Sequence, residues 1–255
     1  MASSSEPQFV RGVWGPYLSA MFEGMHLSEG GQSAAGALID HVIETHAAYG
    51  EAKALAAASG VPVSAALNER LEEMAREGGL ESPHMLARGV HVTPDFLGNR
   101  SPLADPLCRG AVTGLPLSAT LDDLATLYLA VVQSLACQTR HILEEMEVAG
   151  HDKFEAVFCC GGLSKNPLYV KAHADILGVP IVLPECDEAV LLGSAVLAAA
   201  AGGAHPSVAA AMAAMTRAGE TVVGDGGEVE RFCDRKYIVF RRMVDDQMAY
   251  REIMK

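Results

Sequence analysis

The feature that most constrains the fold is a glycine pair between a predicted strand and a predicted helix. Residues 154–160 are mostly apolar and predict a buried strand. Gly161 and Gly162 follow, and Pro167 then opens a helical pattern that Gly178 closes. Glycines at such a turn let backbone approach a ligand because no Cβ intervenes, and the next helix offers free N–H groups to an anion. The pattern predicts a ligand site here; the commoner alternative is a plain connection.

The rest of the chain alternates between strand and helix patterns. Residues 180–183 predict a second strand and residues 188–201 a second helix, so residues 154–201 form a strand–helix–strand–helix unit with Cys159 buried. Further helices are predicted over 36–49, over 61–78 as one or two short helices, over 118–146 with Ser118 as a candidate N-cap, over 208–215 and over 234–254. Short strands are predicted over 91–94 and 110–115. This alternation predicts an α/β fold with a mixed sheet flanked by helices.

Composition excludes several classes of partner. The net charge of −13 argues against nucleic acid and anionic membranes, and 50% hydrophobic residues argue against disorder. No run of 18 apolar residues is present, and residues 1–7 have neither the charged nor the apolar region of a secretory signal. The 6 cysteines contain no Cys-x-x-Cys pair, which fits a reducing cytoplasm. We therefore expect a cytoplasmic protein with no membrane or nucleic-acid partner.

Four ordered blocks carry a family resemblance. They are residues 160–168 (CGGLSKNPL) followed by 173–175 (HAD), residues 12–17 (GVWGPY) followed by 29–36 (EGGQSAAG), residues 94–106 (PDFLGNRSPLADP), and residues 121–125 (LDDLA) at the start of a long helix. Together they resemble the C-terminal domain of the FGGY carbohydrate kinases, and the D-ribulokinase-like subgroup is the most similar. The resemblance runs from about Arg11 to the C-terminus.

The resemblance implies an actin-like, ribonuclease H-like ATPase domain. Such kinases place two of these domains around a cleft, and the N-terminal one holds most of the sugar site and an aspartate that acts as base. Nothing before Arg11 matches that domain, so the chain looks like the nucleotide-binding half. We expect residues 1–10 to be a disordered leader and residues 11–255 to form the nucleotide-binding domain. Implied ligands are ATP and Mg²⁺, with a sugar bound only alongside an N-terminal domain; a homodimer is compatible.

Carried over by motif position, four residues would line the nucleotide site, and Asp40 is a weaker candidate. Gly161 and Gly162 would lie against the adenosine and α-phosphate, and Asn166 would hydrogen-bond the adenine or ribose side. Gly36 matches a family glycine at the same site, and Asp40 lies one helical turn further on. For Asn166 an N-cap role is an alternative compatible with the first, and for Asp40 a solvated helix surface is the stronger interpretation.

Other polar residues have weaker assignments. Gln32 and Ser33 could reach a phosphate or belong to a plain turn. Asn99, Arg100 and Asp105 are interpreted as loop scaffold, with Arg100 in a structural ion pair. The histidine spacing predicts no metal site, and no catalytic residue is assigned.

Two functions follow from these predictions. The first is ATP-dependent phosphorylation of a pentulose such as D-ribulose, with this chain supplying the ATP-binding half and Mg²⁺ bridging the phosphates during in-line transfer. The alternative is a catalytically inactive nucleotide-binding or interaction fragment. The missing aspartate favours the alternative for the isolated chain.

Overall fold

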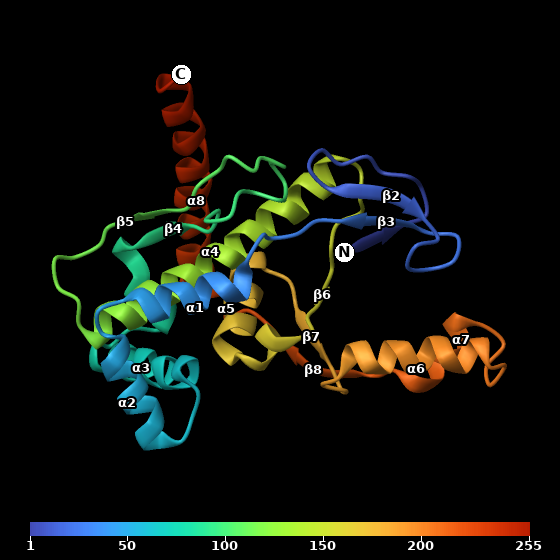
Figure 1. Cartoon of the computed structure of the whole chain (residues 1–255), viewed down its shortest axis with the longest axis horizontal. Coiled ribbons are helices and arrows are strands. Elements are labelled where there is room, and N and C mark those ends of the chain that lie inside the picture. The colour runs from blue at the N-terminus through green and yellow to red at the C-terminus, as the bar shows by residue number, and fades with distance from the viewer.

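The computed structural model describes all 255 residues, and its elements surround one long helix (Figure 1). That helix, α4 (Leu121–Val148), begins with a capping box in which Thr120 accepts a bond from the Asp123 N–H while the Asp123 carboxylate accepts one from the Thr120 N–H. The N-cap is therefore Thr120 and not the predicted Ser118, because only Thr120 stands three residues before a carboxylate that can return the bond. The buried side of α4 forms the main core.

Three helices cover one side of α4. They are α1 (Ala35–Thr45), α2 (Tyr49–Ser59) and α3 (Val63–Glu77), which contribute buried residues to the same apolar cluster. The single helix predicted over 36–49 was wrong, because His46 has an extended backbone that ends α1 and a separate helix begins at Tyr49. The predicted 61–78 segment is one helix.

The chain begins with a strand, which contradicts the expectation that residues 1–10 are disordered. β1 (Ala2–Ser4), β2 (Trp14–Leu18) and β3 (His26–Glu29) form an antiparallel sheet in the order β1-β3-β2. The apolar side chains that hold it are buried together against the end of α4: Ala2, Val10, Val13, Ile142 and Met146. The small polar residues at the start of the chain gave no strand pattern, and this packing against a distant helix overrides their local preference.

A hairpin and the last helix cover another side of α4. β4 (His91–Thr93) and β5 (Ala111–Thr113) pair antiparallel after a 3₁₀ segment, η1 (Pro83–Gly89). The last helix, α8 (Gly227–Ile253), starts seven residues before the predicted 234. Lys236 is buried in its middle, where its ammonium donates to the carbonyl oxygens of Ala87 (2.9 Å) and Val90 (2.6 Å). Burial lowers the pKa of Lys236 to about 8.

The predicted strand–helix–strand–helix unit is confirmed. β6 (Val157–Phe158) pairs parallel with β7 (Ile181–Pro184), which pairs antiparallel with β8 (Ala218–Val222), so this sheet is mixed. α5 (Pro167–Leu177) and α6 (Ala189–Ala201) follow β6 and β7. β6 is only two residues long, and Cys159 beyond it is half-buried and not buried as predicted. The reason is that β6 has a partner strand on one edge only.

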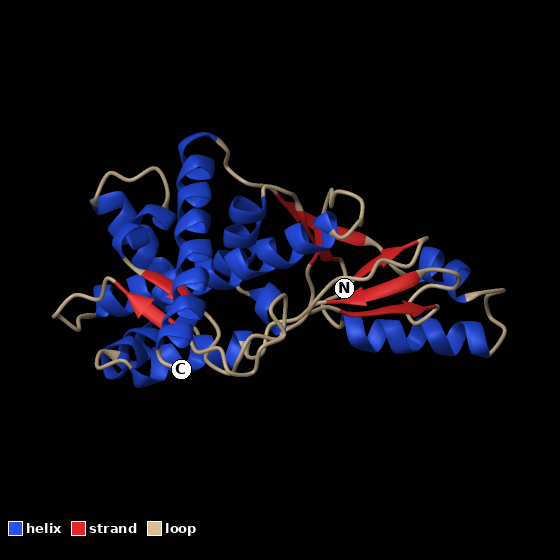
Figure 2. Ribbon diagram, turned by 90° about the horizontal axis from the view of Figure 1, so that it is seen from above, coloured by secondary structure: helices blue, strands red, loops and turns tan.

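One part of the molecule projects from the rest. α6 and α7 (Val208–Met215) pack on each other and extend away from α1–α4, to the right in Figure 1 and again in Figure 2. Only Val196 of α6 and Ala211 of α7 are buried. No helix in the chain combines the length and apolar character needed to cross a bilayer.

Candidate functional site

The glycine turn lies where β6 ends and is open to solvent. Gly161 has a backbone φ of +96°, which a residue with a Cβ rarely adopts, and Gly162 begins a short 3₁₀ turn, η2 (Gly162–Lys165). A Cβ added to either glycine would meet no protein atom within 4 Å. The first N–H groups of a helical turn have no intrahelical acceptor. The turn therefore presents bare backbone and free donors to solvent, which an anionic ligand can use.

Asn166 holds this turn to the helical body. Its Oδ1 accepts from the Leu168 N–H (3.1 Å), which confirms the N-cap interpretation, and from Asn68 Nδ2 (2.9 Å). Its Nδ2 donates to the Tyr128 hydroxyl (2.7 Å), and that hydroxyl donates to Asn68 Oδ1 (3.0 Å). The three side chains form a closed ring of hydrogen bonds that joins α3, α4 and α5. Burial raises the pKa of Tyr128 to about 12, so its hydroxyl stays a donor.

Sequence reasoning missed two members of this ring. Tyr128 lies in the predicted 118–146 helix, where the sequence assigned it no polar role, and its ring is fully buried. Asn68 follows Leu67 on the packed side of α3 and is only partly buried. The available signal was the polar amide of Asn68 next to the core residue Leu67, because a buried polar group requires a hydrogen-bond partner.

Gly36 and Asp40 lie on α1, whose other side joins the core. Gly36 is half-buried with open space at its Cβ position, and Asp40 is exposed. Leu163 of η2 packs against the same apolar cluster as Leu38 and Ile39 of α1. The core therefore connects α1 with the glycine turn. Asp40 lies on the solvent side of α1, which agrees with its interpretation as part of a solvated helix surface.

The side chains of Gln32 and Ser33 form hydrogen bonds within the protein. Gln32 Nε2 donates to the Leu135 carbonyl (2.6 Å) and to Thr139 Oγ1 (3.2 Å), and Ser33 Oγ donates to the Gly98 carbonyl (2.9 Å). These bonds anchor the segment before α1 to α4 and to the loop over residues 94–106. The alternative of a structural turn fits these contacts better than phosphate binding.

The 94–106 loop is braced by its own polar residues. Asn99 donates to Asp95 Oδ1 (2.9 Å) and accepts from the Leu103 N–H (3.0 Å). Arg100 forms an ion pair with Glu29 (2.6 Å) and lies over the Trp14 ring at 4.6 Å. The scaffold interpretation of Asn99 and Arg100 is confirmed.

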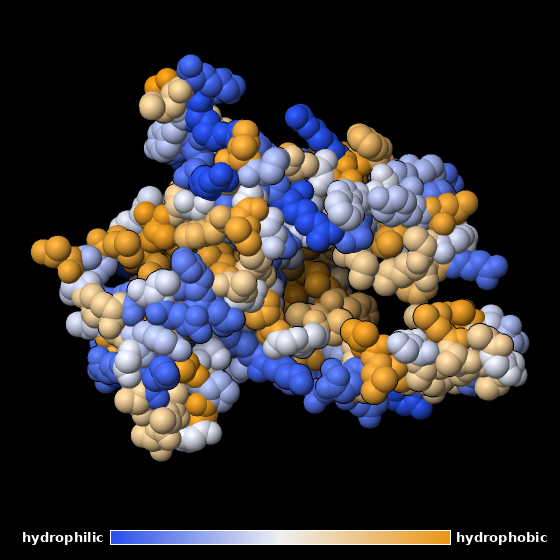
Figure 3. Space-filling model, in the orientation of Figure 1, coloured by the Kyte–Doolittle hydropathy of each residue, from blue (hydrophilic) through white to orange (hydrophobic).

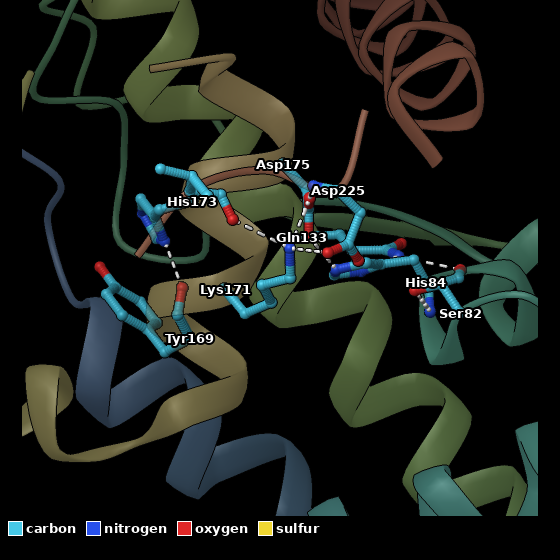
Figure 4. Close-up of polar contacts among 9 residues, drawn as sticks. Ser82, His84, Gln133, Tyr169, Lys171, His173, Asp175 and Asp225 are labelled. Carbon is cyan, nitrogen blue, oxygen red and sulfur yellow. Dashed lines mark hydrogen bonds and ion pairs between the residues drawn. The ribbon is translucent and has the colours of Figure 1, made fainter. Parts of the chain in front are cut away.

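A buried polar cluster behind α5 was not predicted (Figure 4). Asp175 is fully buried and accepts from His84 Nε2 (3.1 Å), Lys171 Nζ (3.0 Å) and the Asp225 N–H (2.7 Å). Burial alone would raise the pKa of the Asp175 carboxyl, but these three donors hold it below its ordinary value. Gln133 donates to the His84 carbonyl (3.0 Å) on the other side. The cluster ties α5 to η1 and to the segment that leads into α8.

His173, two residues before Asp175 on α5, points elsewhere, because residues two apart on a helix do not share a face (Figure 4). Its Nδ1 donates to the Tyr169 carbonyl (2.8 Å), and its Nε2 accepts from Thr139 Oγ1 (3.3 Å). Burial lowers the pKa of His173 to about 4, so the ring is neutral at physiological pH. The residue is a packed part of the core.

The side chains do not build a metal centre. No group of three or more His, Cys, Asp or Glu residues could hold an ion. Mg²⁺ keeps several waters and is commonly held by substrate phosphates with one or two carboxylates. These residues therefore fit Mg²⁺ only as an ion that arrives with a nucleotide.

Comparison with known proteins assigns the chain to a family. Residues 1–202 match the model of the C-terminal domain of the FGGY family of carbohydrate kinases. FGGY carbohydrate kinase domain-containing proteins of Xenopus laevis and Homo sapiens are each 50% identical to this chain over 254 residues, which is 100% of the chain and 45% of each relative. The chain belongs to the FGGY family of carbohydrate kinases and comprises its C-terminal domain. The match starts at residue 1, so the expectation that it begins near Arg11 was wrong.

Two further relatives define the fold and subgroup. A D-ribulokinase of Saccharomyces cerevisiae is 41% identical over 199 residues, 78% of this chain and 28% of that protein. The crystal structure of a xylulose kinase from Rhodospirillum rubrum superposes with a TM-score of 0.65 at 25% identity, covering 90% of this chain and 41% of that one. The predicted actin-like, ribonuclease H-like fold is confirmed. The chain spans less than half the length of these relatives.

Proposed function

We propose that this chain is the ATP-binding part of a pentulose kinase and that the nucleotide binds at Gly161 and Gly162. The observation that carries the proposal is the open turn itself. A Cβ on either glycine would meet nothing, although the turn is anchored below by Asn166 and the core. Free backbone at the start of a helical turn, in a chain of this family, is suited to an adenosine and its α-phosphate.

The contacts of the protein divide the predicted residues into two groups. Gly36, Gly161 and Gly162 keep open surface for a ligand. Both Asn166 Oδ1 bonds are taken, and Nδ2 keeps one hydrogen beyond the bond to Tyr128, so Asn166 would orient the turn and donate one bond to the ribose side. Mg²⁺ bound to the phosphates would supply charge neutralisation for in-line transfer to a sugar hydroxyl.

The substrate class rests on the relatives. The D-ribulokinase match over 78% of the chain supports a pentulose, with D-ribulose as the first sugar to test. We further propose a cytoplasmic location, in keeping with the free thiols of all six cysteines.

A second function has its own supporting observation. The relatives are more than twice as long as this chain, and the chain offers no carboxylate with an assigned role as base. General base assistance alone contributes on the order of 10²–10⁴-fold to a rate. An inactive nucleotide-binding fragment therefore remains the second candidate for the isolated chain.

Calorimetric titration of Mg²⁺-ATP into the wild type and Gly162→Val tests the site. Because a side chain at Gly162 meets open space, the variant should keep its stability and lose nucleotide affinity through collision with the ligand. Gly193→Val, at an open glycine on exposed α6, is the matched control and should bind like the wild type. Equal affinity for the wild type and Gly162→Val would refute the site.

A coupled assay of ADP release across pentuloses and polyols separates the two functions. We expect the isolated chain to bind nucleotide and show no sugar-dependent turnover. Turnover of about one per second, typical of the slower enzymes, would reject the inactive fragment and imply a base within this chain. Asp40, Asp95 and Asp105 would then be the first residues to substitute.

A further inference from the structure

The side chain of Gln133 has a buried oxygen that accepts no hydrogen bond. Gln133 lies on α4 and is 1% exposed, and its Nε2 donates to the His84 carbonyl (3.0 Å) and lies 3.3 Å from His84 Nδ1 (Figure 4). Turning the amide around would place Oε1 against that carbonyl, so His84 fixes which atom of the amide faces it. Oε1 on the other side has no partner in the protein. Such an atom is rare, because burial removes its bond to water without replacing it.

A small cavity lies beside Gln133, where α4 meets α8 and β4. It has a volume of about 10 Å³, and its lining includes Ser134, Cys137, His91 and Lys236. That volume is at the lower limit of the room that one water molecule needs, and a larger ligand does not fit. Apolar cavities stay dry, whereas a buried water typically binds about two to four polar groups. The cavity therefore has the size and the polar lining of a site for one water.

Lys236 lines the cavity but cannot supply the donor that Gln133 lacks. An ammonium group has three hydrogens and accepts no bond. Those of Lys236 are directed to the carbonyl oxygens of Ala87 (2.9 Å) and Val90 (2.6 Å) and to His91 Nδ1 (3.1 Å). All three hydrogens have acceptors, so the partner of Gln133 Oε1 must come from outside the chain.

Ser134 and Cys137 offer the remaining contacts for a water. Ser134 Oγ donates to the Val131 carbonyl (2.7 Å), so its hydrogen is used and a lone pair is free to accept. Burial raises the pKa of the Cys137 thiol to about 12, so the thiol keeps its hydrogen and is a weak donor. A water between them can accept from Cys137 and donate to both Ser134 Oγ and Gln133 Oε1.

We propose that this cavity binds one structural water molecule, which donates a hydrogen bond to Gln133 Oε1. The water completes the hydrogen bonding of Gln133, whose amide joins α4 to η1 through His84. No residue of the glycine turn lines the cavity, so the site is separate from the proposed nucleotide site and independent of the proposed function.

The cavity lies under the part of α8 that attaches this helix to the body. The buried residues of α8 run from Val229 to Val244 and include Lys236 and Phe240, which line the cavity. Beyond them the helix projects from the body, with hydrophilic side chains over most of the face seen in Figure 3. The water is therefore enclosed by the attached part of α8 and exchanges with solvent only when that contact opens.

A high-resolution crystal structure of the wild-type chain tests the site directly. We expect a water oxygen within about 2.5–3.0 Å of Gln133 Oε1, the usual range for a bond between two oxygens. Because no substitution and no nucleotide are involved, this result does not depend on the stability of a variant or on the nucleotide site. A structure with no water at Oε1, or with a water that contacts only other groups of the cavity, would overturn the proposal.

Substitutions of Ala130 test the bond to the water. Ala130 lines the cavity and lies three residues before Gln133 on α4, so the two side chains are neighbours. Ala130→Thr and Ala130→Val have the same shape and displace the water equally, but only threonine offers a hydroxyl to Oε1 in its place. In urea denaturation we expect the unfolding equilibrium constant of Ala130→Val to be about fivefold larger than that of Ala130→Thr, the value of one hydrogen bond.

Ala136→Thr and Ala136→Val are the matched controls. Ala136 is buried on the same helix but does not line the cavity. A hydroxyl there finds no unpaired side-chain oxygen, so the order should reverse and Ala136→Val should be the more stable. If Ala130→Val is as stable as Ala130→Thr or more stable, Gln133 Oε1 does not depend on a water and the proposal is wrong.

Discussion

Replacing Asn166 by alanine should destabilise the protein by more than a lost helix cap. The side chain caps α5 through the Leu168 N–H and also takes part in the ring with Asn68 and Tyr128. In Asn166→Ala the Tyr128 hydroxyl loses its donor, and Asn68 Nδ2 loses its acceptor. The substitution therefore combines a missing cap with one polar group, Asn68 Nδ2, left unpaired in a partly buried position, while the Tyr128 hydroxyl keeps its bond to Asn68 Oδ1.

The magnitude follows from these two contributions. Loss of an N-cap residue costs about 1 kcal/mol. A buried polar group left without a partner costs about 1–3 kcal/mol, and the lower end applies to Asn68, which keeps some contact with water. We expect Asn166→Ala to lower the free energy of unfolding by about 2–4 kcal/mol. Asn166→Ser keeps the cap but loses the ring, so its free energy of unfolding should lie between those of the wild type and Asn166→Ala.

Urea denaturation followed by circular dichroism measures these differences. Ser207→Ala is the matched control, because Ser207 caps α7 through the Ala210 N–H (3.1 Å) in an exposed position with no further side-chain bond. A double-mutant cycle of Asn166→Ala with Asn68→Ala should give a coupling of about 0.5–3 kcal/mol. Equal losses for Asn166→Ala and Ser207→Ala, or a coupling of zero, would refute the ring as a stabilising unit.

Two further predictions concern buried charges. The pKa of Lys236 in the folded protein, about 8, lies below its ordinary value, so the unfolded state binds the proton more tightly. The free energy of unfolding should therefore rise with pH from about 8 towards 10.5, by at most ~1.4 kcal/mol per pH unit. Urea midpoints measured at pH values on either side of this range test the rise; stability should depend less on pH in Lys236→Met, and an equal dependence in both proteins would contradict the argument. Asp175→Ala leaves His84 without its partner and should lower the free energy of unfolding by about 3–5 kcal/mol in the same assay. The Asp225 carboxylate is half-exposed and pairs with Lys171, so Asp225→Ala should lower it by less than about 1 kcal/mol. A similar loss for both variants would contradict the role of the cluster.

The predictable part of this fold is the part with local signals. Asn166, Pro167 and Gly178 delimit α5 as cap, first residue and left-handed stop, and the structure has the helix between them. The 208–215 helix and the end of the 188–201 helix also lie where the apolar pattern put them. Each of these elements is specified by residues within a few positions of its ends.

The unpredicted part depends on partners far along the chain. β1 contains Ala2, Ser3 and Ser4, which have no strand preference, and it forms because β3 pairs with it and α4 covers Ala2. The register of such pairs comes from tertiary packing and leaves no local periodicity. In the site, Gly161 and Gly162 were visible as a motif, whereas the bond from Asn166 to Tyr128 joins residues 38 positions apart.

The arrangement of the core bears on the proposal that this chain binds nucleotide without transferring a phosphoryl group. The glycine turn is attached to the helical body through Asn166 and Leu163, and that body has a complete core of its own in α1–α4. The sheet on the other side of the turn ends in the two-residue strand β6, with an open edge and an exposed Phe158. Contacts from the helical body can therefore keep the turn in place although the outer edge of β6 has no partner strand. Under the proposed function, a nucleotide that contacts only the turn needs no further surface, whereas phosphoryl transfer must also orient a sugar hydroxyl.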